Sequence, residues 1–119
     1  TLVTWGPALH DCLAAAATLA AEGRAAEVVD LRSLAPLDME TVLASVRKTG
    51  RCVVVSQAVN TGSFTAEVAS RVVAEAFDFL DAPVLRVGAK DGIAPQSHIL
   101  EQAFLPGADD IVAACKEIL

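Results

Sequence analysis

Residues 27–55 read EVVDLRSLAPLDMETVLASVRKTGRCVVV and contain one complete unit of strand, helix and strand. The run Glu27–Leu31 predicts a short strand. The run Cys52–Val55 is apolar without alternation, which is typical of a central strand covered on both faces. Strands that are separated by a helix run parallel and are joined by a right-handed crossover. This stretch therefore predicts a parallel α/β sheet.

The helix inside this unit has clear signals at both ends. Asp38 stands where an N-cap belongs, and Leu37 and Val42 are spaced to form a hydrophobic staple across the first turn. Two basic residues in the last turn complement the helix dipole, and Gly50 supplies a left-handed stop. We therefore expect a helix that begins after Asp38 and ends at Gly50.

The same alternation continues on both sides of this unit. Further strands are expected at Leu2–Trp5 and Val84–Val87. Further helices are expected between Gly6-Pro7 and Gly23, between Ser63 and Asp81-Ala82-Pro83, and from about Ala108 to Leu119. The polar stretch Ser56–Ser63 and the turn-rich stretch Gly88–Ser97 are expected to be loops. The pattern predicts an α/β fold, a three-layer open α/β/α domain with a mainly parallel sheet, in which residues 1–119 form one domain.

Composition excludes several classes of protein. With 54% hydrophobic residues, the chain can bury enough apolar surface to fold, so we do not expect disorder. The net charge of −6 disfavours a nucleic-acid partner. The apolar run Cys12–Ala21 is about half the ~20 residues that a membrane span needs, so no membrane partner is expected. Cys12, Cys52 and Cys115 are dispersed, which favours reduced, buried thiols in a cytoplasmic protein over disulfides or a zinc site.

The residue pattern offers few candidates for catalysis. His10, Asp11 and Cys12 are consecutive in a predicted helix, so their side chains point about 100° apart and cannot form one site. His98 has no acidic or cysteine neighbour at ligand spacing and is expected at the surface. The chain also lacks the dinucleotide, P-loop and nucleophile-elbow motifs. We therefore predict no catalytic residue, no cofactor-binding residue and no metal site.

One crevice could still bind a small ligand. If the strand order is second, first, third, fourth, the carboxyl ends of the strands place Gly6-Pro7 beside Ser56–Gly62. Backbone amides of Thr61, Gly62 and Ser63 could then hold a small anion at a helix start. Capping of that helix by Ser63 and close packing at Gly62 explain the same residues without a ligand.

Four longer segments together resemble a known family. They are TLVTWGPALHDCLAAAATLAAEG, AEVVDLRSLAPLDMETVLASVRKTGRCVVVSQA, TGSFTAEVASRVVAEAFDFLDAPVLRV and LEQAFLP. This chain resembles the C-terminal domain of the transketolase superfamily over nearly its whole length. It is most similar to the beta subunit of the thiamine-diphosphate-dependent decarboxylating component of 2-oxo acid dehydrogenase complexes.

The chain departs from the family pattern at several positions. Gln57 stands where the family often has a glutamate, and residues 62–65 read Gly-Ser-Phe-Thr in place of Gly-Gly-Phe-Gly. After the fourth strand, Asp91 and Pro95 fit the family, whereas Ile93 and Gln96 do not. The fold is unaffected, but the substrate stays open between pyruvate, a branched-chain 2-oxo acid and acetoin.

The resemblance implies an oxidoreductase subunit whose cofactors, thiamine diphosphate and Mg²⁺, are held by other domains. It brings no catalytic residue into this chain. It implies an alpha subunit and a second beta subunit in a heterotetramer, and docking to an acyltransferase core. For docking, Asp109, Asp110, Glu117 and the terminal carboxylate of Leu119 are the candidates, because they could steer a basic partner.

Family members also carry a short antiparallel strand before the Leu2 strand. From this we expect the chain to be part of a longer subunit and the edge of its first strand to be less protected. Two alternatives remain open: the C-terminal domain of a deoxyxylulose-phosphate synthase or transketolase, and a free-standing regulatory α/β module that binds a small ligand.

Overall fold

The computed structural model describes residues 1–119 and contains one four-stranded sheet. All of its strand pairs are parallel, and the order is β2-β1-β3-β4. The strands are β1 (Leu2–Thr4), β2 (Val28–Asp30), β3 (Val53–Val59) and β4 (Leu85–Ala89). The helices are α1 (Ala8–Ala21), α2 (Met39–Thr49), α3 (Phe64–Ala76), the 3-10 turn η1 (Phe77–Phe79), α4 (His98–Phe104) and α5 (Ala108–Glu117). The predicted parallel sheet and its conditional strand order are confirmed.

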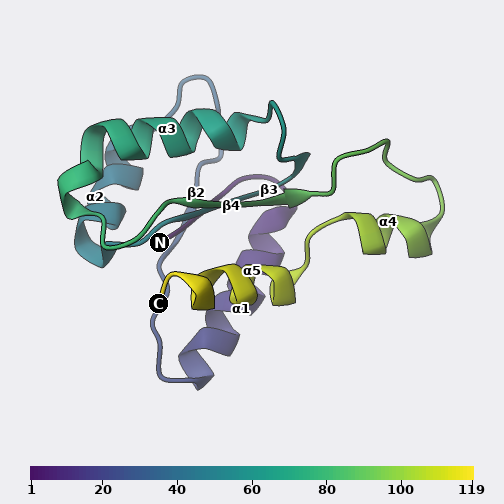
Figure 1. The fold of residues 1–119 in the computed structure, drawn as a ribbon, viewed down its shortest axis with the longest axis horizontal. Helices are drawn as coiled ribbons and strands as arrows, with labels where there is room; N and C mark the ends of the chain where they lie inside the picture. Colours follow the sequence, from purple (N-terminus) through teal and green to yellow (C-terminus); the bar gives the residue numbers. More distant parts are fainter.

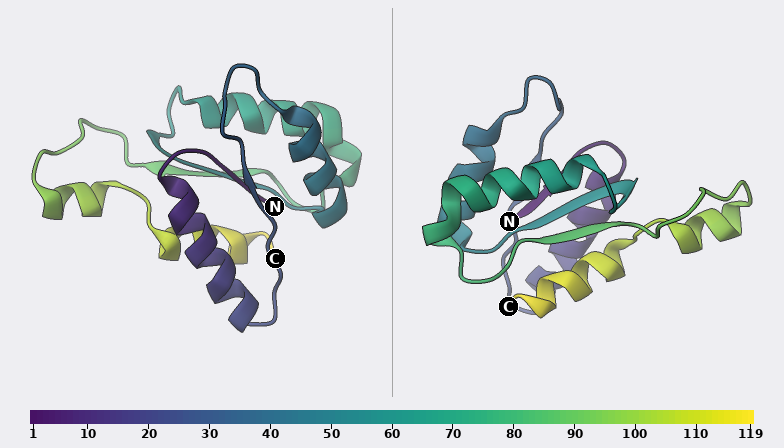
Figure 2. Two further views of the ribbon diagram at one scale, coloured as in Figure 1. Left: turned by 180° about the vertical axis from the view of Figure 1, so that it is seen from behind. Right: turned by 45° about the horizontal axis from the view of Figure 1, so that its top comes forward.

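Helices cover both faces of the sheet, as the three-layer prediction requires. Figure 1 shows α2 and α3 on one side and α1 and α5 on the other, and Figure 2 shows the same arrangement from two further directions. Each face has its own core, because neighbouring residues of a strand point to opposite sides. Val54 of β3 lies in the core under α2 and α3, whereas Val53 and Val55 lie in the core under α1 and α5.

The predicted ends of α2 are confirmed. The Asp38 carboxylate accepts a hydrogen bond from the backbone N–H of Thr41 at 3.0 Å and another from the Thr41 hydroxyl at 2.6 Å. Gly50 ends the helix with a φ of 72°. A side chain at Gly50 would collide with the carboxylate of Asp81, so both the backbone conformation and the close approach require glycine there.

The expected loops after β3 and β4 are partly wrong. Residues Ser56–Val59 continue β3, and Gly88 and Ala89 continue β4. The pairing of these strands shifts register between Val55 and Val59, which indicates a bulge. Polar residues such as Gln57 therefore extend a strand whose first half is apolar. Helix α4 was not predicted at all, and it buries none of its residues. It therefore shows none of the core periodicity by which a helix is recognised in a sequence.

The expectation of a less protected edge on the first strand is wrong. Strand β1 lies between β2 and β3, with Val3 paired to Val29 on one side and to Val54 on the other. The chain steps outward from β1 to β2 and then returns across β1 to form β3. The two strands at the edges of the sheet are therefore β2 and β4.

Replacing Asp38 by alanine tests the cap of α2. Without the carboxylate the Thr41 amide loses its acceptor, so Asp38→Ala should lower the thermal midpoint by about 2–8 °C. Asp38→Ser keeps an acceptor for the Thr41 amide and should lie close to wild type. Thermal unfolding of the three proteins at neutral pH measures this, and equal midpoints for the two variants would contradict the cap.

The same cap gives a pH dependence. Hydrogen bonds from Thr41 hold the pKa of Asp38 below its ordinary value of 3.8. A lowered carboxylate pKa stabilises the fold above the unfolded pKa, and this stabilisation is lost as the pH falls through the folded pKa. The gap between wild type and Asp38→Ala should therefore narrow below about pH 4.

Candidate functional site

The histidines of the chain do not enter a shared site. His10 is exposed on α1, whereas Cys12 of the same helix is buried in the core. His98 lies in α4 and contacts Gln102, one turn further along the same helix, at 3.2 Å. No group of three or more His, Cys, Asp or Glu side chains is placed to hold a metal ion. His10 and Cys12 thus lie in different surroundings, as their spacing on one helix predicted.

The predicted crevice between β1 and β3 has little of the expected architecture. The three cavities described below are lined by neither Gly6 nor Pro7. The Ser63 hydroxyl bonds to the Thr65 hydroxyl and caps no backbone amide, so the expected cap is wrong. A side chain at Gly62 would meet open space, so the expected close packing is also wrong, and its φ of 70° explains the glycine.

A carboxylate further disfavours an anion in this crevice. The Thr61 hydroxyl donates a hydrogen bond to the Asp91 carboxylate at 2.8 Å. This interaction places a negative charge beside the amides that would have to bind the anion. We therefore do not place a binding site at the start of α3.

A cavity of about 520 Å³ lies instead beyond the carboxyl end of β4, between that strand and the segment that joins α4 to α5. Arg86 closes one wall by donating a hydrogen bond to the backbone oxygen of Asn60 at 2.8 Å. A side chain at Gly88 would meet the Asn60 side chain and the backbone of Ala58, so the glycine lets the β3 bulge lie against β4. Lys90 also lines this cavity and makes no ion pair.

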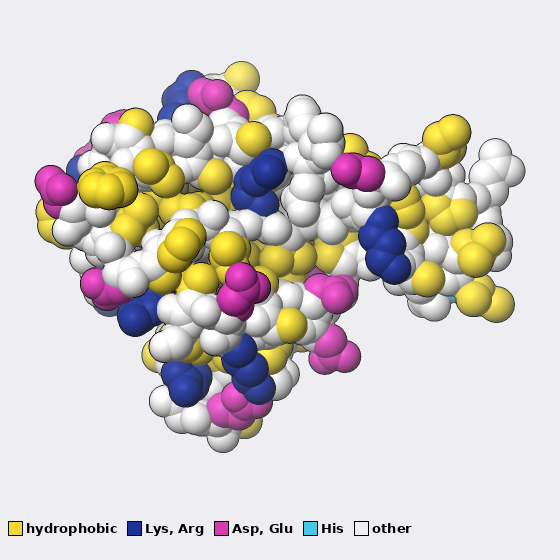
Figure 3. Space-filling view, viewed as in Figure 1, with side chains coloured by type: hydrophobic (Ala, Val, Ile, Leu, Met, Phe, Trp, Pro, Cys, Tyr) yellow, Lys and Arg dark blue, Asp and Glu magenta, His cyan; other side chains and the backbone are white.

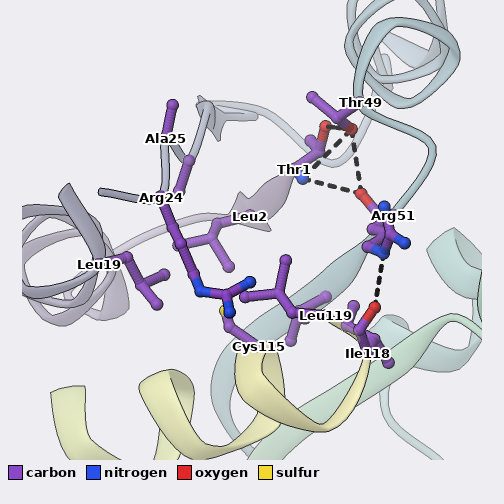
Figure 4. Close-up of a pocket in the computed structure, with 12 residues that line it drawn as sticks. Thr1, Leu2, Leu19, Arg24, Ala25, Thr49, Arg51, Cys115, Ile118 and Leu119 are labelled. Carbon is purple, nitrogen blue, oxygen red and sulfur yellow. Dashed lines mark hydrogen bonds between the residues drawn. The ribbon is translucent and has the colours of Figure 1, made fainter. Parts of the chain in front are cut away.

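A second cavity, of about 330 Å³, lies at the opposite edge of the sheet (Figure 4). Its walls are mostly apolar and include Leu19 of α1 and Cys115 of α5. The Arg51 guanidinium is held beside it by a hydrogen bond to the backbone oxygen of Ile118 at 2.5 Å. Leu119 lines the same cavity. A third hollow, of about 590 Å³, runs along the edge strand β2 and α2.

All three cysteines are buried and free, as predicted. Burial raises the pKa of Cys12 and of Cys52 to about 11, and it raises the pKa of Cys115 as well. A thiol with a raised pKa is a poor nucleophile because only the thiolate attacks. These side chains serve the two cores and the wall of the apolar cavity.

The four predicted docking residues fall into two places. Asp110 and Glu117 are seven residues apart on α5, so they lie on one face, about 10 Å apart along the axis. Asp110 also caps its own helix by accepting a hydrogen bond from the Gly107 N–H at 2.9 Å. Asp109 is exposed in the same first turn, whereas Leu119 lies at the amino edge of the sheet beside the apolar cavity.

Two groups of exposed large apolar residues were not predicted. Residues 90–106, which we call the arm, leave the end of β4, project from the body of the domain and return to α5 (Figures 1 and 3). The arm exposes Ile93, Ile99 and Leu100. A second exposed group, Val73, Phe77 and Phe79, lies at the end of α3. The adjacent apolar pair at 99 and 100, in an otherwise polar stretch, was the available signal in the sequence.

The comparisons with known proteins cover the whole chain. The family described as "Transketolase, C-terminal domain" matches residues 1–111. The beta subunit of the pyruvate dehydrogenase E1 component of Rhizobium meliloti is 42% identical over 99% of this chain and 26% of its own length. The corresponding subunit of Leifsonia xyli is 49% identical over 94% of this chain and 33% of its own length.

Two further matches carry names other than pyruvate dehydrogenase. The beta subunit of acetoin:2,6-dichlorophenolindophenol oxidoreductase of Cupriavidus necator is 43% identical over all of this chain and 35% of its own length. A solved structure, a split-gene transketolase in an inactive beta4 tetramer, superposes with a TM-score of 0.84 at 34% identity. The match covers 99% of this chain and 38% of the transketolase chain. This chain thus spans about a third of the length of these relatives.

The raised thiol pKa values predict slow alkylation of the native chain. With a pKa of about 11, a thiol is ~0.1% ionised at pH 8, against ~25% for an ordinary cysteine. Iodoacetamide at pH 8 should therefore leave Cys12 and Cys52 unmodified in the folded protein and modify all three cysteines in denaturant. Mass spectrometry of both samples measures this, and rapid labelling of Cys52 in the native chain would contradict the assigned burial.

Proposed function

The chain belongs to the transketolase C-terminal domain family, and on this premise we propose that it is the C-terminal assembly domain of a beta subunit. The enzyme is the decarboxylating component of a 2-oxo acid dehydrogenase of the pyruvate, branched-chain or acetoin type. In this proposal residues 1–119 are one domain that supports subunit association and docking and contributes no catalytic residue. The beta-subunit relatives, matched over nearly the whole chain, support this assignment.

The observation that carries the assembly role is the exposed apolar surface. Both cores are closed by helices, yet eight large apolar side chains are left exposed, six of them in two groups, on the arm and around the end of α3. Contiguous exposed apolar groups on a folded domain mark interaction surfaces. We propose an alpha subunit and a second beta subunit as partners in a heterotetramer, located in the cytoplasm. No helix of the chain is long and apolar enough to span a membrane.

The residues present do not fit the cofactor of the complete enzyme. Mg²⁺ with a diphosphate needs several oxygen ligands close together. The polar cavity beyond β4 offers one carboxylate, Asp110, and that group already caps α5. We therefore propose that thiamine diphosphate and Mg²⁺ bind outside this chain.

One observation favours a second candidate. The split-gene transketolase structure supports the C-terminal domain of a transketolase as the alternative. Complementation separates the two candidates: a complete subunit that contains this chain should restore 2-oxo acid decarboxylation to cells that lack the beta subunit. Rescue of cells that lack transketolase, without rescue of decarboxylation, would favour the alternative.

The proposal predicts that the chain alone has no decarboxylase activity. Purified residues 1–119 should show no heat of binding to thiamine diphosphate with Mg²⁺. They should also release no CO₂ from pyruvate or a branched-chain 2-oxo acid, because no diphosphate-binding residues or general acid are gathered in one site. Calorimetry and a CO₂ assay measure this. Turnover that resists further purification would place the active site within this chain.

The proposal also predicts docking through the acidic face of α5. Asp110 and Glu117 share one face of the helix and could steer a basic binding domain of the acyltransferase core. Steering between exposed charges weakens with salt, since the screening length is about 10 Å at 0.1 M. The association rate of the whole decarboxylase with that domain should therefore fall as salt is raised. The Asp110→Asn, Glu117→Gln double variant should flatten this dependence.

Matched variants distinguish steering from helix capping. Asp110→Asn keeps a side-chain oxygen for the Gly107 amide, so it removes charge with little effect on the cap. Glu75→Gln removes one exposed charge on α3, which covers the opposite face of the sheet, and should leave docking unchanged. If the double variant and Glu75→Gln give the same salt dependence as wild type, the docking surface lies elsewhere.

A further inference from the structure

We propose that the apolar cavity at the amino edge of the sheet binds a small aliphatic carboxylate. The hydrocarbon chain of the ligand lies inside the cavity, and its carboxylate pairs with Arg24. This inference goes beyond the proposed assembly function and does not depend on it. It is carried by three observations: how α1 ends, how the polar side chains around the cavity are paired, and how large the cavity is.

The first observation is that the end of α1 fixes a cation at the cavity. The Gly23 N–H donates to the Ala20 oxygen at 3.0 Å, and the Arg24 N–H donates to the Leu19 oxygen at 2.9 Å. With Gly23 at a φ of 79°, these bonds form a Schellman motif. In this motif the residue at the position of Arg24 frequently makes an apolar contact with the residue at the position of Leu19. Here that residue is an arginine, and Leu19 lines the cavity.

The Arg24 side chain extends into the cavity and has no anionic partner. Figure 4 shows it running from the connection after α1 across the cavity toward Cys115. It makes no ion pair, and the terminal carboxylate of Leu119 is not paired with it either. A guanidinium binds a carboxylate through two parallel N–H donors. Arg24 is therefore free to bind an anion whose apolar part lies in the cavity.

The second observation is that the other threonine and arginine side chains of the cavity already have partners. The hydroxyls of Thr1 and Thr49 are hydrogen-bonded to each other at 2.7 Å, and Thr49 also donates to a backbone oxygen. The Arg51 guanidinium lies 3.5 Å from the Asp81 carboxylate. Arg24 alone is left, so the cavity offers one uncompensated positive charge. One charge matches a monocarboxylate, whereas a phosphate dianion would be left half neutralised.

The third observation is the size of the cavity and the nature of its walls. Its volume is about 330 Å³, and the buried side chains of Leu2, Leu19 and Val53 form part of the inner wall. One helical turn with its side chains occupies about 400 Å³, so a helix of another segment does not enter it. The volume is at the low end of the range for small-molecule sites.

The surroundings of the cavity also differ from a docking surface. Of the eight large apolar side chains that are exposed, only Leu119 lines this cavity. Surfaces that bind another polypeptide expose their apolar groups in contiguous patches. Here the apolar area lies mainly inside the cavity, with a single free charge beside it. This combination fits a small amphipathic ligand and indicates a carboxylate with a short aliphatic chain.

Calorimetry with octanoate tests the inference, both on residues 1–119 and on a complete subunit that contains them. Binding should be saturable with one site per chain. The affinity should rise from butyrate to octanoate by up to about fourfold per methylene, because each methylene is buried in the cavity. Absence of saturable binding would overturn the inference. So would binding by residues 1–119 that the complete subunit lacks, because the rest of the subunit would then cover the cavity.

Replacing Arg24 by glutamine tests the pairing with the carboxylate. Arg24→Gln should weaken octanoate binding by about tenfold or more and should leave the binding of uncharged octanol unchanged. The matched control, Arg71→Gln, makes the same chemical change on α3, which covers the opposite face of the sheet. It should leave octanoate binding unchanged. Equal losses for octanoate and octanol in Arg24→Gln would overturn the proposed pairing.

Nuclear magnetic resonance of residues 1–119 locates the ligand. Addition of octanoate should shift the methyl resonances of Leu2, Leu19, Val53 and Ile118, which line the cavity. The methyl resonances of Ile93 on the arm should stay unchanged. Equal shifts at Ile93 would indicate non-specific association with exposed apolar groups and would overturn the inference. None of these measurements involves a partner subunit or decarboxylation, so their failure would leave the proposed function standing.

Discussion

The burial of strand β3 on both faces is the constraint on which the rest of the structure depends. Val53, Val54 and Val55 are almost completely inaccessible, and successive residues face opposite cores. A strand with two apolar faces must be covered twice, so helices have to lie on both sides of the sheet. The crossovers that place α1 and α3 on opposite faces also place β1 and β4 on either side of β3. The three-layer architecture follows from this double burial.

Helices cover both faces of the sheet, so candidate functional surfaces lie at the ends of the strands and on the segments that project from the domain. The carboxyl edge of the sheet carries a polar hollow next to the arm, and the amino edge carries an apolar one between α1 and α5. Neither gathers the groups that acid–base or metal catalysis needs. Large apolar side chains, in contrast, are exposed on the arm and around the end of α3.

Helix α5 shows how one element can serve several purposes without conflict. Ile111 and Cys115 face the core, while Asp110 caps the first turn and lies on a face shared with Glu117. The 3.6-residue repeat makes this possible, because positions three or four apart lie on one side and seven apart return to it. An acidic first turn therefore has a structural reason and still leaves charge in solvent. A substitution at Asp110 must therefore keep the cap if it is to measure the effect of the charge alone.

The sequence by itself determined those features whose physical cause is local. Three such features are the cap at Asp38, the stop at Gly50 and the apolar run of β3. Each depends on neighbours within a few residues, so a local sequence pattern is enough to predict it. Family membership was also predictable, because the matching segments run through the whole chain. The local sequence pattern did not predict that Asp110 and Leu119 lie in different places.

Only the tertiary structure decided that β1 also lies inside the sheet, how far β3 continues and what the arm exposes. Strand β1 is interior because a later strand returns across it, and β3 extends through its polar residues because β4 pairs with them beyond a bulge. Helix α4 left no core periodicity, since none of its residues is buried. In each case the deciding contact joins residues far apart in the sequence, or is missing altogether. Neither a contact between distant residues nor the absence of a contact can be predicted from a local sequence pattern.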